Sequence, residues 1–265
     1  MGCGWLGLPL AESLLAEGYD VFGSTTHPDK LPVLEASGIK PFLIELDQQN
    51  SQVPAQFLDA DLLIINIPPG RKKPEEYLPR LSLLKDRIEI SKVRHILFIS
   101  STAVYAPETE QADEQASIGE EEKSQRLFQA EEMFRHLPNT ATTILRLAGL
   151  IGPKRHPGRF FSGKSEIDNG LAPVNLVHLE DCIRLIKEII SQNYWNQTLH
   201  LAAPTHPTKK DFYTEATARY GGILPLFKNE QLSNKIIDPQ KAIAELGFEF
   251  NHPDLILSLS KGVYE

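Results

Sequence analysis

Short apolar runs alternate with amphipathic stretches along the first two thirds of the chain. Six runs rich in β-branched and other apolar residues predict strands, at 20–24, 40–45, 61–67, 95–100, 142–150 and 198–202. Their nearly unbroken apolar character is typical of parallel strands that are buried on both faces. Leucines and isoleucines three or four residues apart predict helices at 8–17, 75–90, 121–134, 180–191 and 209–220.

This alternation predicts an α/β fold, a Rossmann-type doubly wound parallel sheet with a small C-terminal lobe. The character of the chain changes after Gly152, because the segment from Pro153 to Pro173 contains glycine, proline, arginine and histidine without clear periodicity. We predict a functional loop there. We place an NAD(P)-binding Rossmann domain at 1–152 and a substrate-binding lobe at 153–265, with the last sheet strand returning to the Rossmann domain.

A glycine turn opens the first predicted helix. Its residues are Gly2-Cys3-Gly4-Trp5-Leu6-Gly7, with the GxGxxG spacing. In a dinucleotide-binding turn the first glycine makes the tight turn, the second lets the backbone approach the pyrophosphate, and the third permits close helix packing. The helix N-terminus attracts the phosphates. The spacing predicts a nicotinamide dinucleotide site at Gly2, Gly4, Trp5, Leu6 and Gly7, although glycines also serve ordinary turns.

The chain is unusually short before this turn. A dinucleotide fold places an apolar strand of about five or six residues before the first glycine, and here only Met1 precedes it. Without that strand, the edges of both neighbouring strands would lack backbone partners. We therefore expect a clipped start, with the true N-terminus upstream of Met1. The alternative is a sheet that closes up or borrows a strand from another chain.

Hydroxyl residues replace the acidic residue that usually binds an adenosine ribose. Thr25 and Thr26 stand at that position, after the predicted strand at 20–24. This favours NADP over NAD as the cofactor. His27 and Lys30 could help to neutralise a 2′-phosphate, but the segment has no arginine.

Further cofactor contacts are predicted after two other strands. Asp47 could meet the adenine edge, or it could cap a helix or turn. Asn66 and Pro68 follow an apolar run and stand where the backbone usually passes the cofactor ribose and nicotinamide.

Composition excludes several classes of function. The net charge of −8 and the pI near 5.5 give nucleic acid or anionic lipid little to attract. Cys3 and Cys182 lack the spacing of a zinc site or redox pair, and the eight histidines form no metal motif. No apolar run reaches the roughly 18 residues of a membrane span. We expect a cytoplasmic protein with reduced thiols, no metal site, and no nucleic-acid or membrane partner.

Five segments spread over nearly the whole chain resemble one family. They are the glycine turn, ISSTAVY at 99–105, RLAGLIGP at 146–153, RHPGRFF at 155–161 and VNLVHLED at 174–181. The second resembles the S-S-x-x-V-Y signature of extended short-chain dehydrogenases/reductases. Together they resemble an atypical branch of that superfamily, the NAD-dependent epimerase/dehydratase-like proteins related to nucleoside-diphosphate-sugar epimerases.

The resemblance implies a role for the two serines of the signature. The chain also differs from the family at one catalytic motif. Ser101 would hydrogen-bond the substrate carbonyl, with Ser100 beside the cofactor, although Ser101 could instead cap a turn. Active relatives also carry a YxxxK pair, in which the lysine lowers the tyrosine pKa for proton exchange. Lys123 and Leu127 occupy those positions here, so both members are missing.

Two residues of the same helix could substitute for the missing pair. Arg126 could polarise a carbonyl, and Lys123 could act if it were desolvated enough to lower its pKa. A solvated helix face explains both residues more simply.

The loop after Gly152 is basic within an acidic chain, and in extended relatives it folds over the substrate nucleotide. Arginine forks match phosphate, and phenylalanine can stack on a base. We therefore predict substrate binding by Arg155, His156, Arg159, Phe160 and Lys164, with Lys154 and Phe161 beside them. The alternative is a basic loop paired with surface carboxylates and phenylalanines in the core. His178 is a further substrate-binding candidate, or a core histidine with a backbone partner.

These observations predict an NAD(P)-binding oxidoreductase or epimerase/dehydratase-like protein that acts on a phosphorylated or nucleotide-linked carbonyl compound. The alternative is a non-catalytic dinucleotide-binding protein that senses redox state or binds a partner. Members of this family pair through two long helices. This suggests a homodimer whose interface is formed by the predicted helices at 75–90 and 121–134. Leu83, Leu84, Leu127 and Phe128 permit this, and they equally permit packing on the sheet.

Overall fold

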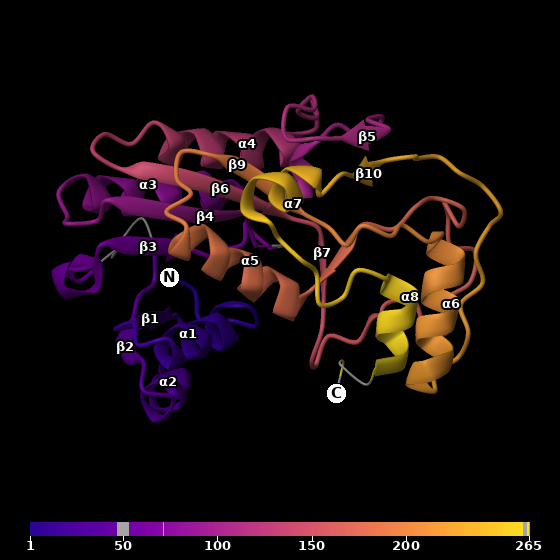
Figure 1. Cartoon of the computed structure of the whole chain (residues 1–265), viewed down its shortest axis with the longest axis horizontal. Coiled ribbons are helices and arrows are strands. Elements are labelled where there is room, and N and C mark those ends of the chain that lie inside the picture. Colours follow the sequence, from indigo (N-terminus) through magenta and orange to yellow (C-terminus); the bar gives the residue numbers. More distant parts are fainter. Residues whose placement is uncertain (47–52, 71, 262–263, 265) are drawn as a thin grey trace. The chain divides into compact units, whose positions relative to one another are not determined.

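A computed structural model describes residues 1–46, 53–70, 72–261 and 264 (Figure 1). The chain forms two compact units, each assembled from separated stretches. The first unit contains Met1–Ser100, Gln125–Leu145 and Ile189–Thr198. The second contains Ser101–Ser124, Arg146–Glu188 and Leu199–Glu265.

Helices and strands alternate along much of the chain (Figure 1). The strands are β1 (Phe22–Thr25), β2 (Lys40–Leu43), β3 (Leu62–Ile65), β4 (His95–Ser101), β5 (Gln111–Ala112), β6 (Ala141–Leu147), β7 (Gly149–Ile151), β8 (Leu176–His178), β9 (Thr198–Leu201) and β10 (Ile236–Ile237). The α-helices are α1 (Gly7–Ala16), α2 (Leu31–Ala36), α3 (Tyr77–Glu89), α4 (Glu122–Arg135), α5 (Leu179–Ser191), α6 (Lys209–Tyr220), α7 (Gln240–Leu246) and α8 (Leu255–Ser258). Short 3₁₀ turns are η1 (Pro28–Lys30), η2 (Ala55–Leu58), η3 (Pro74–Glu76), η4 (Thr102–Val104), η5 (Pro157–Arg159) and η6 (Leu259–Lys261).

The strands form parallel sheets, which confirms the predicted α/β class. A four-stranded sheet has the order β3-β4-β6-β9, and its β3 and β4 are parallel, with Leu62 opposite His95. The pairs β1-β2, β5-β10 and β7-β8 are also parallel.

One predicted strand is wrong in its extent. The apolar run at 142–150 is divided at Ala148, so that β6 ends and β7 begins there. The Ala148 N–H donates to the Leu201 carbonyl, whereas the next N–H, of Gly149, donates to the Asn175 carbonyl. The backbone thus changes its pairing partner from the end of β9 to the segment that leads into β8.

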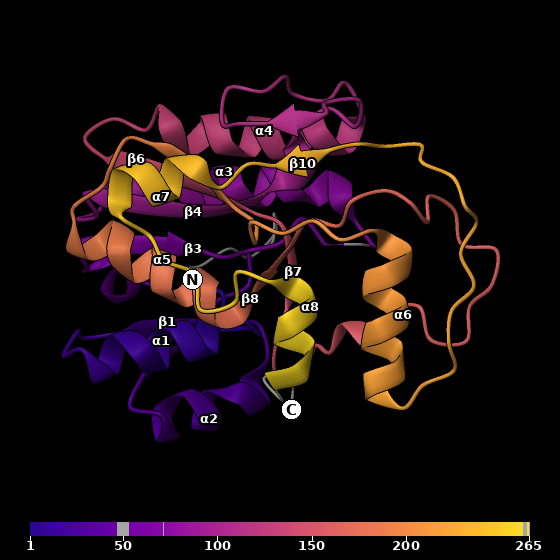
Figure 2. The ribbon, with the colours of Figure 1, turned by 45° about the vertical axis from the view of Figure 1, so that its right-hand side comes forward.

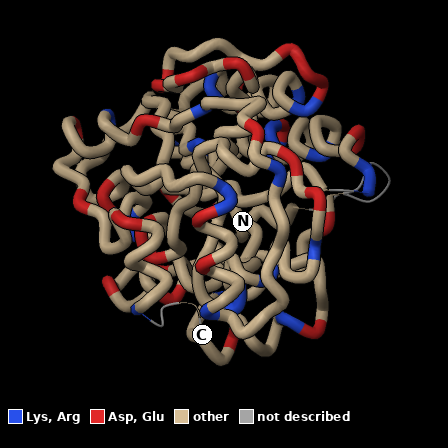
Figure 3. Tube along the Cα trace, turned by 90° about the vertical axis from the view of Figure 1, so that its right-hand side faces the viewer, with Lys and Arg blue, Asp and Glu red and all other residues tan. Residues whose placement is uncertain are grey.

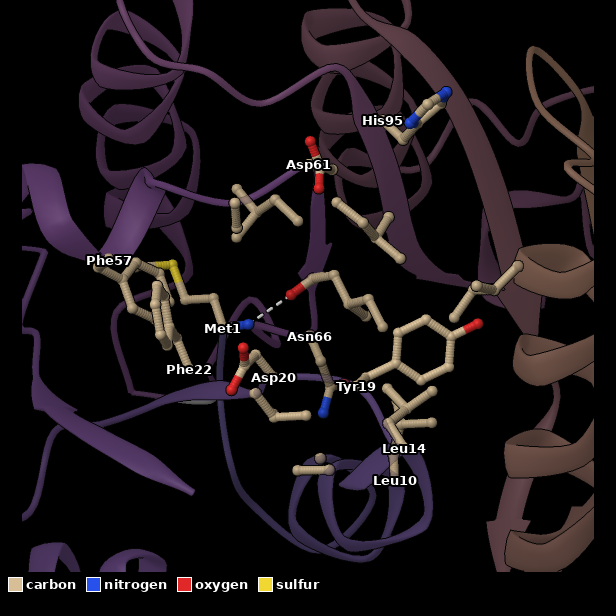
Figure 4. Close-up of a pocket in the computed structure, with 18 of the residues that line it drawn as sticks. Met1, Leu10, Leu14, Tyr19, Asp20, Phe22, Phe57, Asp61, Asn66 and His95 are labelled. Carbon is tan, nitrogen blue, oxygen red and sulfur yellow. Dashed lines mark hydrogen bonds between the residues drawn. The ribbon is translucent and has the colours of Figure 1, made fainter. Parts of the chain in front are cut away.

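In the first unit, β1 and β3 belong to different sheets, with the first residues of the chain between them. The Cys3 N–H donates to the Ser24 carbonyl at 2.9 Å, and the Asn66 N–H donates to the Met1 carbonyl at 3.0 Å. Beside these bonds lies a largely apolar cavity of about 750 Å³. Figure 4 shows Leu10, Leu14 and Phe57 among its lining residues. Phe22 of β1 and Leu62, Leu63 and Ile64 of β3 also line it.

The core of the first unit packs α3 and α4 on the inner strands. Leu81 and Leu84 of α3 are fully buried there, and the rings of Phe98 and Phe134 stack with centroids 5.2 Å apart. Leu127 of α4 is also 3% exposed within this chain. Two of the four residues considered for a dimer interface are therefore covered by the protomer's own packing, and the homodimer stays a prediction.

A smaller cluster joins α1 and α2 beside β1, as two views show (Figures 1 and 2). Its buried members are Ala11, Leu34 and Ile39.

The second unit has its own core around α6, β7, β8 and α8. Phe212 and Ala216 of α6 pack with Ile151 and Leu255, and α6 and α8 lie side by side (Figure 2). The sequence patterns did not predict α2, α7, α8 or β8, which are all short. No helix in the described part of the chain is both long and apolar enough to cross a membrane.

Candidate functional site

The glycine turn of the first unit is closely packed at two of its three glycines. Gly2 has a φ of +90°, and a Cβ built on it would lie 2.3 Å from the Asn66 carbonyl oxygen. A Cβ on Gly7 would lie 2.2 Å from the Gly2 carbonyl oxygen. Both positions therefore require glycine. Gly4 is different, because a Cβ there would meet none of the described atoms within 4 Å, which leaves its backbone open to a ligand.

Hydrogen bonds fix this turn to the ends of β1 and β3. The Gly2 N–H donates to Ser24 Oγ at 3.0 Å, and Asn66 Nδ2 donates to the Gly2 carbonyl at 3.2 Å. Asn66, predicted as a cofactor contact, thus holds the turn. Helix α1 then begins at Gly7 after Leu6, which is buried, and Trp5, which is half-buried. Within the described residues, α1 has no side-chain cap and no acidic residue in its first turn, so its N-terminus suits an anion.

The residues predicted near the adenosine ribose are divided between the interior and the surface. Thr25 is buried, and its hydroxyl accepts from the His27 N–H at 3.1 Å. Thr26, His27 and Lys30 are exposed around η1. Asp47 lies outside the described residues. The exposed side chains that could contact a 2′-phosphate are therefore those of Thr26, His27 and Lys30.

Two buried side chains, of Tyr77 and Glu131, hold the loop after β3 and the end of β4. Neither was predicted from the sequence. The Tyr77 hydroxyl donates to the Ile67 carbonyl at 3.2 Å, next to the exposed Pro68, and burial raises the pKa of Tyr77. The Ser100 hydroxyl donates to the Glu131 carboxylate at 2.6 Å, and both side chains are buried. Ser100, predicted as a cofactor contact, is therefore also a link between β4 and α4.

In the second unit, Ser101 begins the tight turn η4. Its backbone is extended, with φ −138° and ψ 144°, and its hydroxyl oxygen accepts from the Ala103 N–H at 3.2 Å. The Ser124 hydroxyl donates to the Ala103 carbonyl at 2.9 Å and so ties the same turn to the start of α4. Ser101 does cap a turn. A hydroxyl that accepts through its oxygen keeps its hydrogen for another acceptor, so the cap is compatible with donation to a substrate carbonyl.

The positions of the missing YxxxK pair have opposite environments. Lys123 is exposed, whereas Leu127 is buried. Arg126, the predicted substitute, is half-buried in α4. Tyr105 is fully buried, and its hydroxyl lies 2.9 Å from His200 Nδ1. Tyr105 therefore belongs to the interior.

The loop after Gly152 separates its charged residues from its aromatic ones. Lys154, Arg155, Arg159 and Lys164 are exposed. His156 Nδ1 accepts from the Gly158 N–H at 3.0 Å and caps η5, and burial lowers the pKa of His156. Basic and acidic positions are otherwise interspersed along the trace (Figure 3).

The phenylalanines of the same loop pack against α6. The Phe160 and Phe161 rings lie 6.1 and 4.7 Å from the Tyr213 ring, beside the second core. The Nζ atoms of Lys164 and Lys209 lie 5.3 and 5.0 Å from the Phe161 ring centroid. The structure thus places both phenylalanines in packing contacts.

His178 is buried at the end of β8. Its Nδ1 accepts from the Glu180 N–H at 3.3 Å, which is the backbone partner that a core histidine would have. Its ring packs against that of His252, with centroids 3.9 Å apart and the ring planes tilted by 47°. Its role as a substrate contact stays a prediction.

A half-buried lysine of the second unit was missed by sequence reasoning. Lys235 Nζ donates to the Tyr105 carbonyl at 3.1 Å. Burial lowers the pKa of Lys235, and the nearby charge of Lys123 lowers it further, while Glu121 and Glu108 oppose the shift. The position lies far from any motif along the chain, so no local signal could have found it.

Comparisons with known proteins give a curated relative and many structural neighbours. The chain is 38% identical over 262 residues to protein YeeZ of Escherichia coli K12, covering 96% of this chain and 95% of YeeZ. Protein YeeZ of Escherichia coli O157:H7 gives the same figures. No family model matches the chain.

Solved structures of low sequence identity share the fold. A conserved protein of unknown function from Silicibacter pomeroyi has a TM-score of 0.80 and 20% identity, over 98% of this chain and 95% of that one. UDP-glucuronic acid 4-epimerase from Bacillus cereus, in complex with NAD, gives 0.76 and 17%, over 97% and 93%. Human epimerase family protein SDR39U1, with NADPH, gives 0.72 and 18%, over 97% and 95%. The chain therefore has the fold of NAD-dependent epimerases and dehydratases, as its motifs indicated, and it belongs to the family of protein YeeZ.

Proposed function

We propose that this protein is an NAD(P)-dependent oxidoreductase of the epimerase/dehydratase type. The observation that carries the proposal is the glycine turn at the start of α1. Gly2 and Gly7 are too closely packed to accept a Cβ, while Gly4 keeps open space for a ligand. This arrangement matches what a pyrophosphate needs, which is close backbone approach at an uncapped helix N-terminus.

The residues of the first unit fit a nicotinamide dinucleotide. Gly2, Gly4, Trp5, Leu6 and Gly7 would hold the pyrophosphate, and Thr26, His27 and Lys30 would meet the adenosine ribose. NADP is the preferred cofactor, because hydroxyl and basic groups are exposed around η1 and can accept a 2′-phosphate. When bound, the nicotinamide would supply hydride transfer. Two structural neighbours were solved with NAD and NADPH respectively, which supports a dinucleotide but not the choice between them.

The substrate would be an anionic carbonyl compound, phosphorylated or nucleotide-linked. Ser101 would donate its hydroxyl hydrogen to the carbonyl oxygen, because its own oxygen is already oriented by the Ala103 N–H. The exposed Arg155, Arg159 and Lys164 would bind the anionic group. Arg126 of α4 is the residue that would polarise the carbonyl in place of the absent tyrosine.

A second function is favoured by one specific observation. Leu127 is 3% exposed, so the position of the family's lysine is part of the core. General acid/base assistance is worth about 10²–10⁴-fold in rate, and a protein without the tyrosine–lysine pair could bind the dinucleotide without turnover. Such a protein would sense the redox state of the cofactor or present a surface to a partner.

Calorimetric titration with NADPH and NADH tests cofactor binding, and a variant tests the chemistry. We expect tighter binding of NADPH than of NADH, and failure of both to bind would refute the proposal. For any nucleotide-sugar carbonyl that is turned over, Ser101→Ala should lower kcat by about 10²–10³-fold, the usual loss for one such donor, while cofactor affinity is unchanged. Ser260→Ala, at an exposed position, is the matched control. Cofactor binding with a redox-dependent change in oligomeric state and no turnover would favour the sensor.

A further inference from the structure

A cluster of two histidines and a glutamate lies in the second unit, outside the groups assigned to the proposed function. One ligand atom from each of His178, Glu180 and His252 lies within 4.8 Å of the other two. We propose that these three side chains bind a single transition-metal ion of the zinc type. The sequence patterns predicted no metal site, because His178 and His252 are far apart along the chain and have no metal-binding spacing around them.

The backbone around the cluster is fixed by hydrogen bonds. Glu180 lies in the first turn of α5, and its N–H donates to His178 Nδ1 at 3.3 Å. The buried Asp181 carboxylate accepts from the N–H groups of Asn251 and His252, at 2.6 and 3.2 Å. These bonds bring the segment at 251–252 against the start of α5. The side chains that would bind the metal therefore extend from a prearranged backbone, which a specific site needs.

His252 is buried beside the Glu180 carboxylate. Its ring is buried, with 4% of its side chain exposed, and its Nε2 lies 2.9 Å from Glu180 Oε2. The Nε2 atom of this buried imidazole faces the Glu180 carboxylate and is therefore the ligand atom that His252 would offer to a metal ion.

The donor set determines the class of metal. Two imidazoles and one carboxylate suit zinc and similar ions, whereas magnesium and calcium prefer oxygen ligands alone. Three protein ligands leave a fourth position for water. Glu180 has 52% of its side chain exposed, so an ion can enter from solvent on that side.

Binding of an ion would open the shortest contact in the cluster and draw in its wider ones, because the three ligand atoms lie up to 4.8 Å apart. Ligand atoms about 2.0–2.1 Å from a tetrahedral zinc are roughly 3.3 Å apart, so the 2.9 Å between Glu180 and His252 would open by a few tenths of an ångström. The exposed Glu180 side chain can make that movement. His252 would bind the metal through an Nε2 atom that carries no proton.

The chain offers a matched control for an ordinary histidine–glutamate pair. His136 Nε2 lies 3.0 Å from Glu132 Oε2, a separation similar to that at His252. That pair is more exposed, with 74% of the His136 side chain accessible, and neither residue belongs to a metal-capable cluster among the described residues. Loss of His136 should therefore leave metal binding unchanged.

Calorimetric titration of the EDTA-treated full chain with ZnCl₂ tests the site. We expect one equivalent to bind. Glu180→Gln and His252→Gln should each weaken binding by at least about tenfold, while His136→Gln binds as the unchanged protein does. Titration with CoCl₂ should produce visible absorption bands that Glu180→Gln removes.

Other outcomes would overturn the proposal. It fails if the unchanged protein binds less than half an equivalent, if Glu180→Gln binds zinc as tightly as the unchanged protein, or if His136→Gln weakens binding equally. His252→Gln alters a buried ring and could unfold the second unit, which circular dichroism would reveal. Glu180→Gln changes an exposed side chain and should leave the fold intact. If His252→Gln unfolds the second unit, zinc binding by Glu180→Gln therefore decides whether the site exists.

Discussion

The hydroxyl of Ser100 donates a 2.6 Å hydrogen bond to the carboxylate of Glu131, and both side chains are buried. Ser100 lies near the end of β4, and Glu131 lies in the middle of α4. The bond therefore fixes the end of the strand to the helix that covers it. Ser100, which was predicted from the sequence to contact the cofactor, thus has a structural role inside the first unit.

Removal of this hydroxyl should destabilise the protein. Ser100→Ala deprives a buried carboxylate of a donor, and hydrogen bonds to charged groups contribute about 1.5–3 kcal/mol. We expect the free energy of unfolding to fall by that amount in urea denaturation. Ser260→Ala removes an exposed hydroxyl that donates to the Leu257 carbonyl, where water can take its place, so it should change the free energy of unfolding by less than about 0.5 kcal/mol. A change of less than about 0.5 kcal/mol in Ser100→Ala as well would show that the buried bond contributes little.

The parts of this protein that sequence could predict are those encoded locally. The glycine turn is a short motif, and the structure places Gly2 and Gly7 at positions that accept no Cβ. The long helices and the buried strands follow from periodicity over many residues. In contrast, β8 has three residues and α8 has four, which is too short for a periodic pattern.

Contacts between distant segments left no signal in the sequence. The pairing of His178 with His252, and of Lys235 with the Tyr105 carbonyl, depends on how the second unit folds. The division of one apolar run into β6 and β7 depends in the same way on which strands lie beside it. Ser101 is an intermediate case, because its signature indicated the turn but not the hydrogen bond that orients its hydroxyl.

Substitutions within the glycine turn should separate folding from cofactor binding. Gly7→Ala places a Cβ 2.2 Å from the Gly2 carbonyl oxygen, and it should destabilise the protein by about 1–3 kcal/mol. Gly4→Ala meets open space in this structure and should leave the free energy of unfolding nearly unchanged. Its methyl group would occupy the place of the pyrophosphate, so NADPH affinity should fall at least about tenfold. Tight NADPH binding by a folded Gly4→Ala protein would contradict the proposed cofactor site.

The cavity between β1 and β3 predicts a gain in stability from an added strand. Phe22 and Ile64 line it from the two facing strands. A designed extension of five valine and isoleucine residues before Met1 should pair with both and fill the apolar space. Each kcal/mol gained would raise the Tm of a chain of this size by about 2–4 °C. The control is a protein with an extension of equal length made of glycine and serine. Equal melting temperatures for the two would show that the cavity does not accept a strand.

Lys235 should react with acylating reagents at lower pH than the lysines in surface ion pairs. Burial lowers the pKa of Lys235, so more of its amine is neutral and nucleophilic at a given pH, whereas the bond to Asp59 raises the pKa of Lys92. Mass spectrometry of the protein after brief acetylation at pH 8 should therefore find Lys235 modified before Lys92, although Lys92 is the more exposed. Lys123→Met removes a positive charge that lowers the Lys235 pKa, so it should slow acetylation at Lys235 and leave Lys92 unchanged. Faster modification of Lys92 in the unchanged protein would show that the Lys235 amine is not shifted in this direction.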